Sequence, residues 1–130
     1  MKKKFLENYL KQIIKTDGPI AVSRFMAEAI NNPHYGYYNF SEAAIGKRGD
    51  FITSPEVSQV FGELLGLWCG SIWLDMKKPD PFLLVELGAG KGTLLKDALR
   101  ALELIPGFLG SVKLHIVETS SNMQEQQRKV

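Results

Sequence analysis

Residues 85–93 read VELGAGKGT, and this stretch decides the fold. An apolar, strand-like run from Phe82 to Leu87 leads into it, and a helical pattern rich in leucine and alanine follows it. Glycines let a backbone turn sharply and approach a ligand without a clash at Cβ, and the start of the following helix presents free N–H groups. The order strand, glycine turn, helix is therefore typical of a nucleotide-binding site.

A second strand-like run, Val112 to Val117, ends in the acid Glu118. In dinucleotide folds, a carboxylate at the tip of the second strand accepts hydrogen bonds from both ribose hydroxyls. Glu118 lies 30 residues after Gly88, more than the usual ~20, and the loop from Ile105 to Gly110 accounts for the difference. A further helix is expected from about Ser121. We predict an α/β fold in which a helix joins two parallel strands.

Three nucleotide-binding classes compete for the glycine turn. A Walker A loop requires glycine where Val85 stands and Ser or Thr where Gly92 stands, so this class fails. The dinucleotide fingerprint fits imperfectly, because Thr93 occupies the place of its third glycine. The third form has an acid, Glu86, two positions before the first glycine, and it resembles the first motif of class I methyltransferases. An acid that merely ends a strand is the alternative for Glu86.

The chain upstream of the turn is predicted to be mainly helical. Apolar residues repeat at helical spacing from Phe5 to Ile14 and from about Val22 to Asn31. The aromatic segment from Tyr35 to Tyr38 suits a short extended stretch. A longer helix is expected from the loop before Ser54 to about Asp75.

The start of that longer helix carries clear signals. Ser54 can cap it and Pro55 suits its first position, while Thr53 with Glu56 would form a capping box one residue earlier. Glycines then recur every fourth residue and favour close packing against another helix; they are Gly62, Gly66 and Gly70.

Composition and charge exclude several classes of protein. The net charge is +2, and basic residues beyond the opening Lys2-Lys3-Lys4 are interspersed with acids, so no basic face points to nucleic acid. The most apolar stretch, Val60 to Leu74, contains Glu63 and is shorter than the ~20 residues that a membrane span requires. With no metal-ligand spacing around His34 or His115, we expect no metal site.

The single cysteine and the N-terminus bear on location. Cys69 excludes an internal disulfide, fits a reducing compartment and is expected to be a buried structural thiol. No signal peptide follows the opening lysines, because Glu7 and Asn8 interrupt any apolar segment. These features predict a cytoplasmic protein.

Three blocks of the chain together resemble the MidA-type methyltransferases. They are GDFITSPEVSQVFGE at residues 49–63, Val85 to Gly88, and Val117 to Ser120 with Gln126. The first block is far more specific than the glycine turn. The resemblance implies methyl transfer from S-adenosyl-L-methionine to a protein arginine, since the mitochondrial members of that family are complex I assembly factors that dimethylate an arginine of a complex I subunit.

The resemblance also implies roles for particular residues. Glu86 would hold the methionine end of the cofactor, with the turn passing beneath it. The full set of expected cofactor-binding residues is Glu86, Gly88, Ala89, Gly90, Gly92 and Glu118. The candidate catalytic acids, which would partner the acceptor guanidinium, are Asp50, Glu56 and Glu63.

Family members are longer, and a class I methyltransferase sheet has more strands than the two expected here. We therefore predict an α/β fold with a helical or lid region at residues 1–80, then the first βαβ unit of an incomplete Rossmann-like sheet at residues 81–130. A second polypeptide completing the fold is one expectation. The alternative function is a truncated remnant, at most a nucleotide-binding or interaction module without catalysis.

Overall fold

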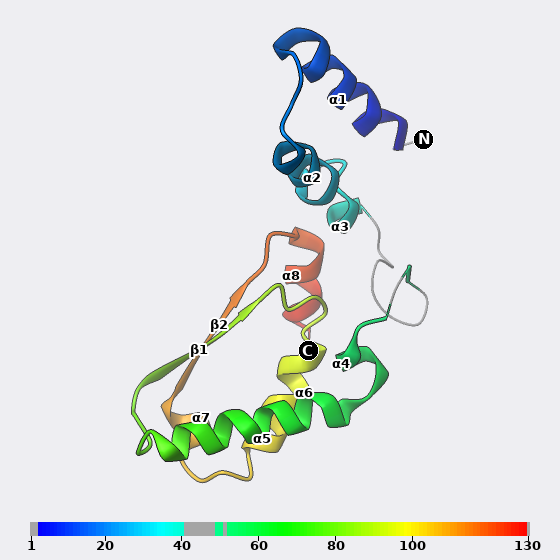
Figure 1. The fold of residues 1–130 in the computed structure, drawn as a ribbon. Coiled ribbons are helices and arrows are strands. Elements are labelled where there is room, and N and C mark those ends of the chain that lie inside the picture. Colours follow the sequence, from blue (N-terminus) through cyan, green and yellow to red (C-terminus); the bar gives the residue numbers. More distant parts are fainter. Residues whose placement is uncertain (1–2, 41–48, 51, 130) are drawn as a thin grey trace.

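The structure is a computed structural model that describes residues 3–40, 49–50 and 52–129. Its N-terminal part is helical, with α1 at Lys3–Asp17, α2 at Val22–Asn31 and α3 at Tyr37–Phe40. α1 lies at the end of the molecule furthest from the sheet (Figure 1). It ends where Gly18 adopts a φ of +85° and its N–H donates to the carbonyl oxygen of Ile14 at 3.0 Å. The helices predicted in this region are confirmed.

The extended stretch predicted from Tyr35 to Tyr38 is wrong. The side-chain oxygen of Asn32 accepts hydrogen bonds from the backbone N–H groups of His34 and Tyr35, both at 3.0 Å. This local turn redirects the chain after α2, and the helical turn α3 follows it. Asparagine side chains compete with extended structure in this way, and aromatic strand preference does not overcome them here.

The single helix expected from Ser54 to Asp75 is two helices, α4 at Ser54–Val57 and α5 at Gln59–Asp75. Ser58 is extended, with a φ of −152°, and its side chain accepts from the N–H of Val60 to cap α5. Thr53 is the N-cap of α4 but forms no side-chain cap bond. The capping box is therefore not formed, because the Glu56 carboxylate points to Thr93 instead.

The strands are β1 at Phe82–Leu87 and β2 at Val112–Val117, and they pair in parallel with Phe82 opposite Val112. α6 at Thr93–Leu102 and the short α7 at Phe108–Ser111 form the crossover, and α8 at Ser121–Gln127 follows β2. The predicted α/β unit of strand, glycine turn, helix and parallel strand is confirmed. α7 lies in the segment expected to be loop.

α5 packs along α6, side by side in Figure 1. A Cβ atom on Gly66 would lie 2.5 Å from the carbonyl oxygen of Ala98, and one on Gly62 would lie 2.7 Å from Cβ of Asp97. Only glycine permits this approach, so the prediction of close helix packing is confirmed. The contact crosses the predicted domain boundary at residue 80.

The apolar core lies at the amino-terminal ends of the two strands. Trp73 of α5, Leu102 of α6 and Phe108 of α7 are its buried centre, and Phe82 packs against them. The Phe108 ring meets the rings of Phe82 and Trp73 edge-on at centroid distances of 5.0 and 5.3 Å. The opposite, carboxyl ends of the strands are thereby left free for the glycine turn.

Alternate residues of β1 face outward, although this strand was expected to be buried on both faces. Leu83, Val85 and Leu87 are 63%, 51% and 76% exposed.

Cys69, expected to be buried, is half-buried, and desolvation raises the pKa of its thiol. Among the described residues, no helix has the length and apolar character needed to cross a membrane.

Candidate functional site

The glycine turn directly follows β1 at the carboxyl edge of the sheet. Gly88, Gly90 and Gly92 have φ values of +69°, +55° and +82°, a region that favours glycine. The N–H of Gly88 donates to the carbonyl oxygen of Val117 at 2.8 Å and extends the sheet into the turn. The N–H of Gly92 donates to the carbonyl oxygen of Ala89 at 2.8 Å. The backbone around Gly90 is thus fixed by a hydrogen bond of Gly88 on one side and of Gly92 on the other.

A pocket of about 230 Å³ opens over this turn. Two segments distant in sequence line it, because α4 and the residue before it lie across from β1 and the start of α6. The lining residues are Thr53, Pro55, Glu56, Glu86, Gly88, Ala89, Gly90, Lys91, Thr93 and Leu94. Of the six predicted cofactor-binding residues, the pocket brings together Glu86, Gly88, Ala89 and Gly90.

Glu86 is the chemically distinctive group of the pocket. Its Oε2 atom is buried and has no hydrogen-bond partner among the described residues. Burial raises the pKa of this carboxyl group above its ordinary value, since desolvation disfavours the charged form. A buried polar atom without a partner is costly, so the site suits a ligand that carries a positively charged donor.

Glu56 spans the pocket from α4 to the turn. Its Oε1 accepts a hydrogen bond from the Thr93 hydroxyl at 2.5 Å, and its Oε2 lies 3.6 Å from Nζ of Lys91. Both oxygens of this carboxylate are thus engaged with protein groups. In this state Glu56 joins α4 to the start of α6.

Glu118 lies just beyond β2 and lines a second pocket of about 290 Å³. Its Oε1 accepts from the N–H of Ser120 at 2.8 Å, and its Oε2 accepts from Nε2 of Gln127 at 3.4 Å. The same Nε2 donates to the carbonyl oxygen of Gly90 at 2.8 Å. Gln127 therefore links the predicted ribose acid to the glycine turn.

Gln127 was not predicted from the sequence, which gave its neighbour Gln126 only as part of the family resemblance. The Gln126 carboxamide instead donates to Asn122 on its own helix at 3.3 Å. Helical periodicity could have indicated Gln127. Met123 is the apolar residue of α8 and is 2% exposed, and Gln127 lies one helical turn beyond it on the same face.

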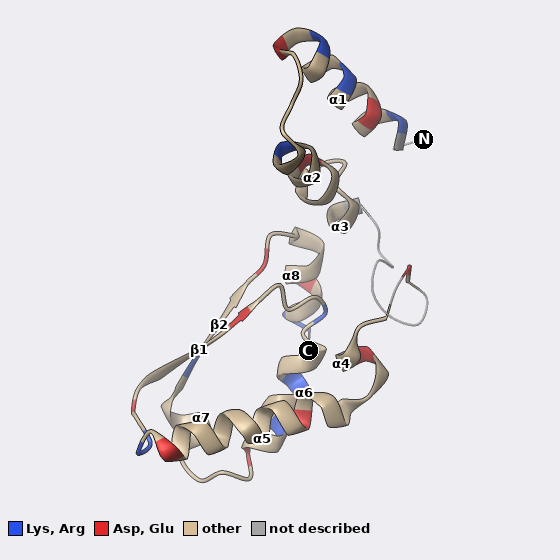
Figure 2. Ribbon diagram, viewed as in Figure 1, with Lys and Arg blue, Asp and Glu red and all other residues tan. Residues whose placement is uncertain are grey.

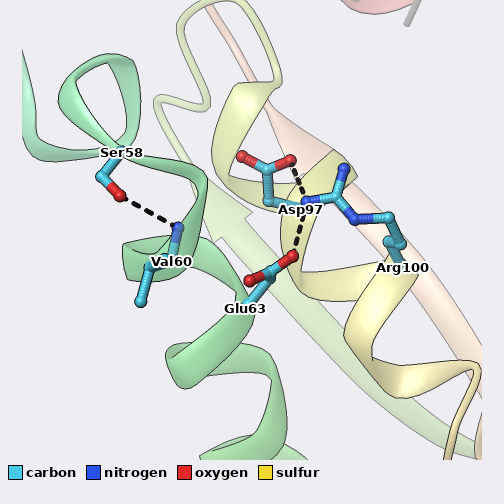
Figure 3. A network of polar contacts seen from close by, with 5 residues as sticks. All are labelled: Ser58, Val60, Glu63, Asp97 and Arg100. Carbon is cyan, nitrogen blue, oxygen red and sulfur yellow. Dashed lines mark hydrogen bonds and ion pairs between the residues drawn. The ribbon is translucent and has the colours of Figure 1, made fainter.

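The other two candidate acids do not line the pocket over the glycine turn. Asp50 accepts a hydrogen bond from the Tyr37 hydroxyl, and this bond raises the pKa of Tyr37 to about 12. Glu63 projects from α5 toward α6 and pairs with Arg100 at 2.8 Å (Figure 3). Arg100 also pairs with Asp97 at 3.0 Å. The structure thus places Glu63 in a helix–helix contact.

Charges are mixed along the described helices rather than gathered on one of them (Figure 2). α1, for example, carries Glu7 and Lys11 as an ion pair one turn apart. Across the part of the chain that the structure describes, no three His, Cys, Asp or Glu side chains meet as a metal-binding group.

Fold and site together define the class I methyltransferase type of nucleotide-binding unit: a parallel βαβ unit, a glycine turn with an acid two residues before it, and an acid after the second strand. A family model described as "Putative S-adenosyl-L-methionine-dependent methyltransferase" matches residues 64–130. The chain belongs to this family, and the resemblance to MidA-type methyltransferases is confirmed.

Curated relatives extend the match over most of the chain. The protein arginine methyltransferase NDUFAF7 of Xenopus laevis is 47% identical over 122 residues, 92% of this chain, and the human protein is 46% identical over 119 residues. The chain spans 28% and 27% of these two relatives' lengths. Both are named as mitochondrial, so the prediction of a cytoplasmic protein is wrong.

A solved structure agrees with the fold. A COG1565 superfamily member from Burkholderia thailandensis, solved with S-adenosyl-homocysteine bound, is similar with a TM-score of 0.79 and 31% sequence identity. The similarity covers 98% of this chain and 33% of that one. It includes the N-terminal helices as well as the βαβ unit, so the helical region belongs to the same architecture.

Proposed function

We propose that this chain binds S-adenosyl-L-methionine over the glycine turn and serves methyl transfer to a protein arginine. One observation carries the proposal: the buried Oε2 of Glu86, which lines the pocket over the turn, has no hydrogen-bond partner among the described residues. The methionine end of the cofactor carries an ammonium group, which supplies the charge and the donors that this carboxylate needs. The family match and the S-adenosyl-homocysteine bound to the bacterial relative support the same cofactor.

The remaining groups fit the rest of the cofactor. Glycine at positions 88 and 90, both of which line the pocket, leaves the backbone bare where a ligand must approach it. Glu118 offers carboxylate oxygens to the two ribose hydroxyls. When bound, the cofactor supplies an electrophilic methyl group on a sulfonium. The protein's part is to align an acceptor nitrogen with that group and to accept a proton.

We propose Glu56 and Asp50, in that order, as the acids that partner the acceptor guanidinium. Glu56 lines the pocket together with Pro55 and Thr53. Asp50 belongs to the same upstream segment and is oriented by Tyr37. Glu63 is engaged with Arg100 and is withdrawn from this role.

The proposed substrate and partners are supported by the relatives' names, by the family resemblance and by one exposed surface. The curated relatives are named protein arginine methyltransferases, and we propose a protein arginine, on a complex I subunit, as the acceptor. We also propose that transfer needs further strands from additional polypeptide, because β1 presents Leu83, Val85 and Leu87 to solvent. In this scheme residues 1–80 form the helical or lid region and residues 81–130 hold the nucleotide.

Calorimetry with S-adenosyl-homocysteine tests the cofactor claim, with Glu86→Ala as the variant and the exposed Glu125→Ala as its control. Binding to the wild type and the control, and loss of at least tenfold in affinity in Glu86→Ala, is the expected result. Labelled methyl incorporation, followed by mass spectrometry, tests the reaction. We expect transfer to arginine when the chain is fused to the remaining segment of the Xenopus laevis relative. Binding with no transfer from the fusion would leave a nucleotide-binding module.

A further inference from the structure

We propose that Gln127 is a positioning residue that sets the ribose specificity of the cofactor site. One atom carries the argument: Nε2 of Gln127 donates to the carbonyl oxygen of Gly90 at 2.8 Å and to Oε2 of Glu118 at 3.4 Å. The side chain therefore fixes the distance between the glycine turn and the acid of β2. This inference rests on the proposed function, because it concerns how the same site holds the ribose.

The backbone of α8 lies against the turn at the same place. A Cβ atom on Gly92 would lie 3.6 Å from Cγ and 3.8 Å from Cα of Gln127. Packing of α8 against Gly92 and the hydrogen bond to Gly90 thus both fix the position of Gln127. α8 itself is held at its other end, where the Ser120 hydroxyl donates to the carbonyl oxygen of Tyr38 at 2.9 Å.

The two donors to the Glu118 carboxylate use only part of its capacity to accept hydrogen bonds. A carboxylate offers about four lone-pair positions on its two oxygens. The N–H of Ser120 takes one on Oε1 and Nε2 of Gln127 takes one on Oε2. Within the described part of the chain, one position on each oxygen has no donor, which matches a pair of neighbouring hydroxyls. Without Gln127, only the N–H of Ser120 holds the carboxylate, at Oε1, so Oε2 can shift and the two-point match to a ribose diol is weakened.

The test compares Gln127→Met with Gln126→Met. Methionine keeps the length of the side chain and removes the donor, and Gln126 is one residue away on the same helix, bonded to Asn122. Calorimetry measures S-adenosyl-homocysteine and its 2′-deoxyribose analogue on each full chain. In the wild type and in Gln126→Met, we expect the ribose ligand to bind about tenfold more tightly than the deoxy analogue. In Gln127→Met, this preference should shrink to about twofold.

A ligand-free readout separates this proposal from the proposed function. The N–H of Gly92, bonded to Ala89, should exchange with solvent at least several-fold faster in Gln127→Met than in Gln126→Met. If the wild type binds no S-adenosyl-homocysteine, the proposed function fails, and the exchange rates alone decide the positioning role. Equal exchange in the two variants, or an unchanged ribose preference in Gln127→Met, would overturn the inference.

Discussion

The Thr93 hydroxyl donates a hydrogen bond to the Glu56 carboxylate across 37 residues of sequence. Thr93 is the first residue of α6, and Glu56 lies in α4. The bond therefore joins the two segments that line the pocket over the glycine turn, α4 and the start of α6. It also places a negative charge at the amino end of α6, where the helix dipole favours it.

Removing that hydroxyl should destabilise the chain. Hydrogen bonds to charged groups contribute ~1.5–3 kcal/mol, so we expect Thr93→Val to lower the free energy of unfolding by about that amount. Urea denaturation measures it. Thr16→Val, at an exposed position of α1, is the matched control and should change stability by less than about 0.5 kcal/mol. Equal losses in the two variants would show that the bond to Glu56 contributes nothing.

Gly90→Val should abolish binding of S-adenosyl-homocysteine. Gly90 has a φ of +55° and lines the pocket, so a branched side chain there is strained and occupies the ligand's space. Gly110→Val is the control, since a Cβ atom at that glycine meets nothing within 4 Å. Calorimetry gives the affinities, and circular dichroism verifies that each variant folds. Full affinity in a folded Gly90→Val chain would remove the turn from the site.

Glu118→Ala should weaken binding of S-adenosyl-homocysteine by roughly tenfold or more, because two ribose hydroxyls lose a charged acceptor. Glu125→Ala, an exposed acid on α8, should leave the dissociation constant unchanged. An unchanged constant for Glu118→Ala would reduce Glu118 to an acid that ends a strand. Tight binding of NADH by the wild type would favour the dinucleotide class.

The raised pKa of Glu86 predicts a pH effect of definite sign. Burial raises the folded-state pKa above the ordinary value of 4.5, so the native state holds the proton more tightly than the unfolded chain. Stability from this group is therefore present at pH values below 4.5 and is lost as the pH rises through the raised pKa. Urea titrations give the free energy of unfolding of the wild type and of Glu86→Gln. We expect the difference, wild type minus variant, to fall between acidic and neutral pH. A pH-independent difference would contradict the assignment.

Gly66→Ala should destabilise the helix pair. Alanine stabilises an isolated helix by ~1 kcal/mol relative to glycine, but its Cβ would lie 2.5 Å from the backbone oxygen of Ala98. Overpacking of this kind costs ~1–3 kcal/mol, and a backbone atom cannot move aside alone. We expect a net loss of up to about 2 kcal/mol, measured by urea denaturation. Ser71→Ala, exposed on α5, is the control; a stabilised Gly66→Ala chain would disprove the close contact.

Periodicity and turn chemistry predicted those parts of the fold that local sequence controls. The glycine turn, both strands and the stripe on α5 lie where the sequence places them, since each depends on spacing within one segment. The aromatic segment after α2 was misassigned because a single side chain, Asn32, redirects the backbone. The break at Ser58 was missed because the helical pattern continues through it.

The candidate site was harder to predict, because it depends on contacts between segments. Glu56 and Glu63 are one pair of similar acids in the same block, yet one reaches the glycine turn and the other reaches Arg100. Only the placement of α4 and α5 against α6 separates them. Gln127 was not predicted because a difference of one residue on a helix turns a side chain by about 100°, and only the packing of α8 against the glycine turn selects Gln127.

The parallel register has a consequence for how the chain folds during synthesis. Every residue pair between β1 and β2 is separated by 30 positions, as Phe82 is from Val112. Closing such a loop costs entropy before strand pairing repays it. β1 therefore leaves the ribosome well before its partner and carries Leu83, Val85 and Leu87 as an unpaired apolar strand. Pairing with β2, completed when Val117 accepts the Gly88 hydrogen bond, satisfies the backbone of β1 on that edge, whereas Leu83, Val85 and Leu87 stay exposed. The unpaired strand is therefore accessible to chaperones until the pairing forms.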